Sequence, residues 1–168
     1  IHGASPVSLR LGSGAGSFAA ATAVNVGSAP SSVKFLDLNA DGRLDLTVGN
    51  GGDSSISVLL GNGLGSYGKK SSYPAGLAPS FVALADTNGD GAPDVAATHP
   101  GTNSLSILRG DGTGAFGPPT SFAVGSSPGS VAFGDLNGDG DLDMAVANKG
   151  SGAISVLLAD GAGGFGAA

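Results

Sequence analysis

One acidic stretch of nine residues occurs three times in this chain of 168 residues. It reads Asp-Leu-Asn-Ala-Asp-Gly-Arg-Leu-Asp at 37–45, and its copies begin at residues 86 and 135, so the spacing is 49 residues both times. Every copy has Asp, Asn, Asp and Asp at positions 1, 3, 5 and 9, and Gly at position 6. A repeat of this period restricts the fold to architectures that stack one supersecondary unit several times.

The alternating side-chain oxygens predict a metal site in each copy. Such ligands, with a glycine at the sixth position, let a short loop surround one hard cation, and Ca²⁺ prefers oxygen ligands. Position 7 varies, as expected of a residue that contributes only its backbone carbonyl. We therefore predict three Ca²⁺ ions per chain. The predicted ligands are Asp37, Asn39, Asp41, Arg43 and Asp45; Asp86, Asn88, Asp90, Ala92 and Asp94; and Asp135, Asn137, Asp139, Asp141 and Asp143.

Two other interpretations of the acidic loops are weaker. An EF-hand loop begins in the same way, but it requires a Glu at position 12 and a helix on each side. Position 12 is Val48, Ala97 or Val146 here, and each lies in a short apolar run rich in β-forming residues. Asp, Asn and Gly are also ordinary turn formers. Turn chemistry alone does not place four oxygen acceptors at the same positions three times.

Composition excludes several classes of function. Nine of the thirteen acidic residues lie at the repeated loop positions, so the net charge of −6 is a property of the predicted metal sites. Seven Lys and Arg residues without a basic cluster argue against a nucleic-acid partner. No apolar stretch approaches the length of a membrane span. The chain has no Cys and no Glu, which leaves few candidates for acid–base or nucleophilic catalysis. We therefore expect no enzymatic activity.

The rest of the sequence keeps the same 49-residue register. Each repeat is expected to contain four short strands, which in the first complete repeat lie near residues 32–37, 45–50, 55–60 and 67–74. The second and third strands are apolar on both faces, which predicts sheets covered on both sides. Most aromatic residues fall in repeated columns and are expected in the core. These columns are Phe18, Tyr67, Phe116 and Phe165; Val24, Tyr73 and Phe122; and Phe35, Leu84 and Phe133.

Short four-stranded meanders with this period are typical of the blades of a β-propeller. The predicted fold is therefore all-β, a β-propeller of 49-residue blades, with one calcium loop per blade and about three blades per chain. The chain is expected to form a single unit over 1–168. Residues 1–30 form a partial blade with the third and fourth strands, 31–79 and 80–128 form complete blades, and 129–168 form a blade that lacks most of its fourth strand.

The acidic loop at 135–143, the apolar strand after it and the Gly-Gly-Phe-Gly turn at 163–166 resemble the FG-GAP/VCBS repeat family. The resemblance extends over the whole chain, and the family includes integrin α-subunit propellers and lectins of the Psathyrella velutina type. It implies that the loop joins the first two strands of a blade and holds Ca²⁺. The Gly-Ala-Pro of the family name is absent, because the corresponding sites read Gly-Asn-Gly, Thr-His-Pro and Ala-Asn-Lys, beginning at residues 49, 98 and 147.

This resemblance implies an extracellular or cell-surface binding module, since low-affinity calcium loops suit external calcium. Carbohydrate is the expected ligand. A protein–protein adhesion or scaffold module is the alternative, and so is a non-catalytic repeat fragment of a larger secreted protein. A polar column at the strand ends, formed by Asn50, His99 and Asn148, is predicted to contact the ligand. The tripeptide Arg109-Gly110-Asp111 is attributed to chance, because its Gly and Asp fit the repeated turn.

Assembly is predicted from the blade number. Closed propellers usually have four to eight blades, and three blades alone would expose two large apolar faces. We predict that two chains close a six-bladed ring with twofold symmetry, in which the fourth strand of one chain completes the last blade of the other. The alternative is that the chain is a fragment of a longer propeller.

Overall fold

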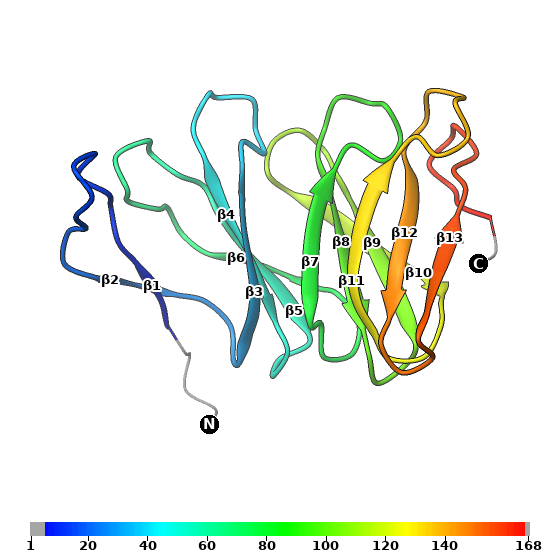
Figure 1. Ribbon diagram of the computed structural model, residues 1–168. Coiled ribbons are helices and arrows are strands. Elements are labelled where there is room, and N and C mark those ends of the chain that lie inside the picture. Colours follow the sequence, from blue (N-terminus) through cyan, green and yellow to red (C-terminus); the bar gives the residue numbers. More distant parts are fainter. Residues whose placement is uncertain (1–5, 167–168) are drawn as a thin grey trace.

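The computed structural model describes residues 6–166, and these residues form thirteen β-strands. The strands form four antiparallel sheets, and within each sheet every strand pairs with its neighbour in the chain. Figure 1 shows the sheets following one another from the N-terminal to the C-terminal side of the molecule. This arrangement confirms the predicted all-β architecture of stacked blades.

The strand bounds agree closely with the repeat. The half-blade contains β1 (Pro6–Leu9) and β2 (Thr22–Asn25). The first blade contains β3 (Pro30–Leu36), β4 (Asp45–Asn50), β5 (Ser55–Leu59) and β6 (Ser71–Pro74). The second blade contains β7 (Phe81–Ala85), β8 (Asp94–His99), β9 (Ser104–Gly110) and β10 (Phe116–Ala123). The third blade contains β11 (Pro128–Gly134), β12 (Asp143–Asn148) and β13 (Ala153–Leu157). Where the domain boundaries lie stays a prediction.

The three blades share one pairing register. In the first blade Val48 lies opposite Val33 on one side and Ser57 on the other. The residues 49 and 98 positions later pair in the same way, so a serine column runs through the third strands at Ser57, Ser106 and Ser155. A one-residue slip would move every apolar side chain to the opposite face of its sheet. The common register therefore keeps equivalent residues on the same face of the sheet in all three blades.

Apolar layers between adjacent sheets hold the blades together. Leu46, Val48 and Leu59 pack toward the half-blade, Ile56, Val58 and Val95 fill the layer between the first two blades, and Leu105, Ile107 and Met144 fill the next. The strands β4, β5 and β8 are buried along their whole length. This confirms the prediction of sheets covered on both sides.

The outer face of the third blade departs from that prediction. The Ile154 and Val156 side chains on β13 are 68% and 45% exposed. No sheet of the described residues covers this face, because β11–β13 form the last sheet of the stack (Figure 1). The same apolar pattern therefore gives a buried strand inside the stack and an exposed strand at its end.

The aromatic columns meet between neighbouring blades. Tyr73 packs edge-on against Phe116 with the ring centroids 5.6 Å apart, and Phe122 packs in the same way against Phe165 at 5.5 Å. Each pair therefore joins the fourth strand of one blade to the following blade. Two aromatic residues of the columns depart from the expected core position, Phe18 at 69% exposure and Phe35 at 45%.

The half-blade and the third blade lie at opposite ends of the stack in Figure 1. The predicted closure of a six-bladed ring by two chains stays a prediction. Within residues 6–166 there is no helix long and apolar enough to cross a membrane.

Candidate functional site

Each acidic loop connects the first and second strands of its blade, that is β3 to β4, β7 to β8, and β11 to β12. The glycine at the sixth position has a positive φ in all three loops, with values of 79° at Gly42, 88° at Gly91 and 94° at Gly140. Residues with a side chain rarely adopt this left-handed conformation. The repeated glycine is therefore required by the curl of the loop.

The oxygens of the first loop converge on its own backbone. The amide N of Asp41 lies 3.2 Å from both the Asp37 Oδ1 and the Asn39 Oδ1 atoms, and the amide N of Gly42 lies 2.7 Å from the Asp37 Oδ2 atom. The middle loop repeats this pattern, with its fifth amide 3.2 Å from the Asp86 carboxylate. The predicted ligands at the first and third positions are thus brought together by the fold of the loop.

Local hydrogen bonds lower the pKa of one carboxyl group in each loop. For Asp37, desolvation raises the pKa, but backbone N–H donors, led by that of Gly42, lower it by more. For Asp90 and Asp139, the pKa is lowered by the backbone N–H two residues later and by the Asn side chain two residues earlier. In each loop the charged form of this one carboxyl group is therefore favoured, and that form binds a cation.

The Asp at the ninth position has a structural role that the sequence did not reveal. Asp45, Asp94 and Asp143 are 0% exposed. The Asp45 carboxylate accepts hydrogen bonds from the Leu38 N atom at 2.9 Å and the Gly61 N atom at 2.8 Å, and the other two blades repeat both bonds. This carboxylate therefore joins the acidic loop to the turn that follows the third strand. No residue pattern signals these contacts, because both donors are backbone groups.

The donor set of each loop fits Ca²⁺ in its chemistry. It consists of carboxylates, one side-chain amide oxygen and one backbone carbonyl, and hard cations prefer such oxygen ligands. Within residues 6–166, no group of three His or Asp side chains lies close enough together to hold a metal ion without other ligands. The amide and carbonyl oxygens at the third and seventh positions would therefore have to complete the coordination. Calcium at these loops, and the ligands assigned to it, stay a prediction.

The column predicted to contact a ligand is buried, with exposures of 0% for Asn50, 1% for His99 and 3% for Asn148. The Asn50 side chain accepts a hydrogen bond from the Gly27 N atom at 3.0 Å and donates one to the Ser57 Oγ atom at 2.9 Å. In these contacts the side chain ties the end of the second strand to the segment that leads into the blade. The assignment of the column to ligand binding stays a prediction.

His99 makes the corresponding contacts in the second blade. Its Nδ1 atom lies 2.9 Å from the Leu77 carbonyl oxygen, which can only accept, so Nδ1 carries the proton. Its Nε2 atom lies 2.8 Å from the Ser106 Oγ atom. Burial lowers the pKa of His99, and the Leu77 and Ala75 backbone groups offset this effect only in part. The ring therefore stays neutral at neutral pH.

We expect the His99→Asn variant to remove part of the pH dependence of stability. The pKa of His99 lies below its unfolded value of 6.5, so between these two values the unfolded chain binds more protons. The stabilisation is present above pH 6.5 and is lost as the pH falls toward the folded pKa, with a slope of at most about 1.4 kcal/mol per pH unit. Urea unfolding between about pH 7.5 and 5 measures it. Identical pH profiles of the two proteins would contradict the expectation, and Asn is the matched substitution because it stands at Asn50 and Asn148.

Three grooves lie at equivalent places between neighbouring blades. The first groove, of about 400 Å³, is lined by residues 22–25 and 65–68 with Leu59 and Lys70. The second, of about 220 Å³, contains Ser71 and Tyr73 opposite residues 113–115. The third, of about 650 Å³, is lined by residues 121–125, Ser155, Leu157, Phe165 and Gly166. Six residues that line the third groove follow their counterparts in the first by 98 positions, so the grooves are a product of the repeat.

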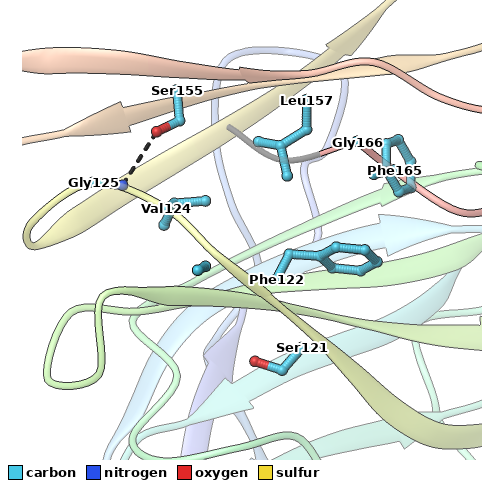
Figure 2. A pocket seen from close by; sticks show the side chains of 9 residues that line it. Ser121, Phe122, Val124, Gly125, Ser155, Leu157, Phe165 and Gly166 are labelled. Carbon is cyan, nitrogen blue, oxygen red and sulfur yellow. Dashed lines mark hydrogen bonds between the residues drawn. The ribbon is translucent and has the colours of Figure 1, made fainter.

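The third groove is the largest because no strand pairs with the free edge of β13 among the described residues. Phe122 and Phe165, which pack edge-on against each other, line it together in Figure 2, and both are only partly buried. The Ser155 hydroxyl accepts hydrogen bonds from the Gly125 N atom at 3.1 Å and the Asn148 Nδ2 atom at 3.0 Å. This groove thus combines two aromatic rings with a hydroxyl group on its wall.

Asn148 has hydrogen-bonding capacity left beside this groove. Its buried Oδ1 atom has no hydrogen-bond partner within residues 6–166, and a buried amide oxygen without a partner is rare in folded proteins. The corresponding oxygen of Asn50 is bonded to Gly27. Of the three residues predicted to contact a ligand, Asn148 is therefore the one with an open acceptor.

The Arg-Gly-Asp tripeptide is not presented as an exposed tip. The Arg109 Nη1 atom lies 2.5 Å from the Asp94 Oδ2 atom, and the guanidinium also donates to the Gly163 carbonyl oxygen in the third blade. Gly110 lies within β9. These contacts agree with the interpretation that the tripeptide occurs by chance.

Comparisons with known proteins identify the repeat. A model of the FG-GAP-like repeat matches residues 37–97 and 86–146, and a model of the FG-GAP repeat matches residues 127–167. Similar solved structures include an Agrocybe aegerita lectin, described as recognising non-reducing terminal N-acetylglucosamine, with a TM-score of 0.62 and 21% identity over 95% of this chain and 45% of that chain. The chain thus spans less than half the length of that lectin, and the likeness shows a propeller fold. The comparison with curated proteins gave no match. Because the matched segments cover most of the sequence, the chain belongs to the FG-GAP repeat family.

Proposed function

We propose that the chain is an extracellular or cell-surface propeller module that is stabilised by calcium and binds carbohydrate. The calcium part is supported by the three repeated loops, whose oxygens converge at the first and third positions. The carbohydrate part is supported by the fold that the chain shares with the Agrocybe aegerita lectin. A repeat-family chain with few catalytic groups favours binding over catalysis.

The third groove carries the proposal for the binding site. Its volume of about 650 Å³ falls in the range of small-molecule sites, which combine apolar walls with a few polar groups. Phe122 and Phe165 provide apolar surface for the C–H face of a sugar ring, and Ser121 and Ser155 also line the groove. Asn148 lies behind the wall of the groove, with its Oδ1 atom buried, and its Nδ2 atom donates to the Ser155 hydroxyl, so it would orient that hydroxyl toward a sugar.

Repetition supports the same conclusion. The grooves recur between successive blades, so one chain offers more than one related site. Weak sites on one molecule gain strength when they engage a multivalent ligand. Such multivalency suits glycans, in which the same terminal sugar is displayed many times.

A glycan array on the calcium-loaded chain tests the proposal. We expect binding to glycans with a defined terminal sugar, and terminal N-acetylglucosamine is the first to examine because the similar lectin is described as recognising it. Phe165→Ala should weaken binding of the positive glycan about tenfold or more. The control is Phe18→Ala, which belongs to the same aromatic column but lies outside the three grooves. Melting curves of both variants verify that they are folded.

A protein–protein adhesion module is the second candidate. The exposed apolar row of Ile154, Val156 and Leu158 on the outer face of the third blade favours it, because contiguous exposed apolar surface often marks a protein interface. A blank glycan array, together with saturable binding of a defined protein partner that Ile154→Lys abolishes, would replace the carbohydrate proposal with this one.

A further inference from the structure

The middle loop differs from the other two at two positions that touch each other. Thr87 stands where the first and third loops have Leu38 and Leu136. Arg109 stands where the other blades have Leu60 and Leu158. Both changes replace an apolar residue by a polar one, and both occur in the second blade.

These two residues bind the ninth-position carboxylate of their loop. The Arg109 Nη1 atom lies 2.5 Å from the Asp94 Oδ2 atom and also donates to the Thr87 hydroxyl oxygen. The Thr87 hydroxyl in turn donates to the Asp94 carboxylate. Asp94 is 0% exposed, so its charge is compensated inside the protein by a guanidinium.

The extra donors reduce the number of lone pairs that Asp94 can offer to a cation. An ionised carboxylate offers about four lone-pair sites on its two oxygens. In the first and third loops each oxygen of the ninth-position Asp accepts one backbone hydrogen bond, which leaves room for a cation. The Asp94 Oδ2 atom instead receives the Thr87 N–H, the Thr87 hydroxyl and Arg109. This oxygen has no lone pair left for a metal.

The Arg109 guanidinium also lies close to the rest of the middle loop. Its Nη2 atom donates to the Gly163 carbonyl oxygen in the third blade. A Cβ atom added to Gly163 would lie 2.9 Å from the Asn88 Cβ atom, so the turn of the third blade rests on the middle loop beside the guanidinium. A fixed positive charge a few ångströms from a cation site opposes binding of a second cation.

We propose that Arg109 is the built-in cation of the middle loop, and that this loop consequently binds Ca²⁺ more weakly than the first and third loops. The inference rests on the proposed calcium function of the loops. It implies that the chain holds two ions firmly and the third only at higher calcium. It also implies that the second blade depends least on calcium for its folding.

Calorimetric titration of the calcium-free chain with Ca²⁺ tests this inference. The wild type should show two tighter sites and one weaker site. Arg109→Leu, which restores the residue of the other blades, should tighten the weakest site about tenfold or more, because Asp94 regains acceptor capacity and the repulsion disappears. In the Asp90→Ala background the middle loop lacks a ligand, so Arg109→Leu should there leave the affinities of the two remaining sites unchanged.

A transplant into the first blade provides the matched control. The double variant Leu38→Thr/Leu60→Arg places the same pair beside Asp45 and should weaken the first loop. If the melting curve shows that Arg109→Leu is unfolded, this double variant still tests the inference. Three equal sites in the wild type, or a weakest site unaltered in Arg109→Leu, would overturn the inference while leaving calcium binding intact. Absence of bound calcium in every variant by elemental analysis would overturn the calcium proposal itself, and this inference with it.

Discussion

Chelation of calcium by EDTA is expected to lower the melting temperature of the chain by about 10 °C or more. A ligand that binds only the folded state stabilises it by about 2.7 kcal/mol per site at about 100 times its Kd. For a domain of this size each kcal/mol shifts the melting temperature by about 2–4 °C. Two firmly bound ions therefore account for a shift of this size.

The physical reason lies in the clustering of like charges. The three loops contain ten of the thirteen acidic residues of the chain, and without a cation the carboxylates within each loop repel one another. Differential scanning calorimetry with and without excess Ca²⁺ measures the shift, and Mg²⁺ at the same ionic strength controls for general charge screening. A melting curve that EDTA leaves unchanged, with no calcium by elemental analysis, would contradict the prediction.

Asp45→Ala should destabilise the chain by about 3–5 kcal/mol even in EDTA. Removing this side chain leaves the N–H groups of Leu38 and Gly61 without the acceptor that both now share. Both groups are tied to a fully buried carboxylate, and a hydrogen bond to a charged group contributes about 1.5–3 kcal/mol. Urea denaturation in EDTA measures the loss of unfolding free energy.

Asp41→Ala is the matched control for this prediction. Its side chain is exposed and belongs to the same loop, so in EDTA its removal should cost much less than that of Asp45. In calcium both variants should lose stability, because both lose a predicted ligand. Equal losses for the two variants in EDTA would show that the ninth position acts only through the metal.

The strands were predictable because the same pattern of apolar strand residues and acidic loop residues occurs three times in the sequence. Residues 45–50, 94–99 and 143–148 were expected as second strands, and β4, β8 and β12 have those bounds. Alternation of apolar side chains fixes the face that each strand buries, and the glycine at the sixth loop position marks the curl between strands. The fourth strand of the first blade is shorter than the expected 67–74, because β6 covers only Ser71–Pro74 and the expected start at Tyr67 forms an isolated bridge to Gly61.

The contacts of the candidate sites were not predictable in the same way. The burial of Asn50 and His99 depends on the segment that leads into each blade, where Gly27 and Leu77 offer backbone groups. The pairing of Thr87 with Arg109 joins positions 22 residues apart in the chain. Such contacts depend on how the connecting segments and loops fold back on their own blade, which sequence periodicity does not describe. The sequence signal for the Thr87–Arg109 contact was that both residues depart from the leucines found at these positions in the other blades.

The consecutive pairing of strands within each sheet has a consequence for how such a chain folds and lengthens. Every hydrogen-bonded ladder closes within one 49-residue segment, so a sheet can form without a strand from another repeat. Duplicating or deleting one whole segment would leave all ladders intact and alter only the apolar layer at one junction. The architecture can therefore lengthen by duplication of 49 codons at a time, and each longer chain can still form all of its sheets.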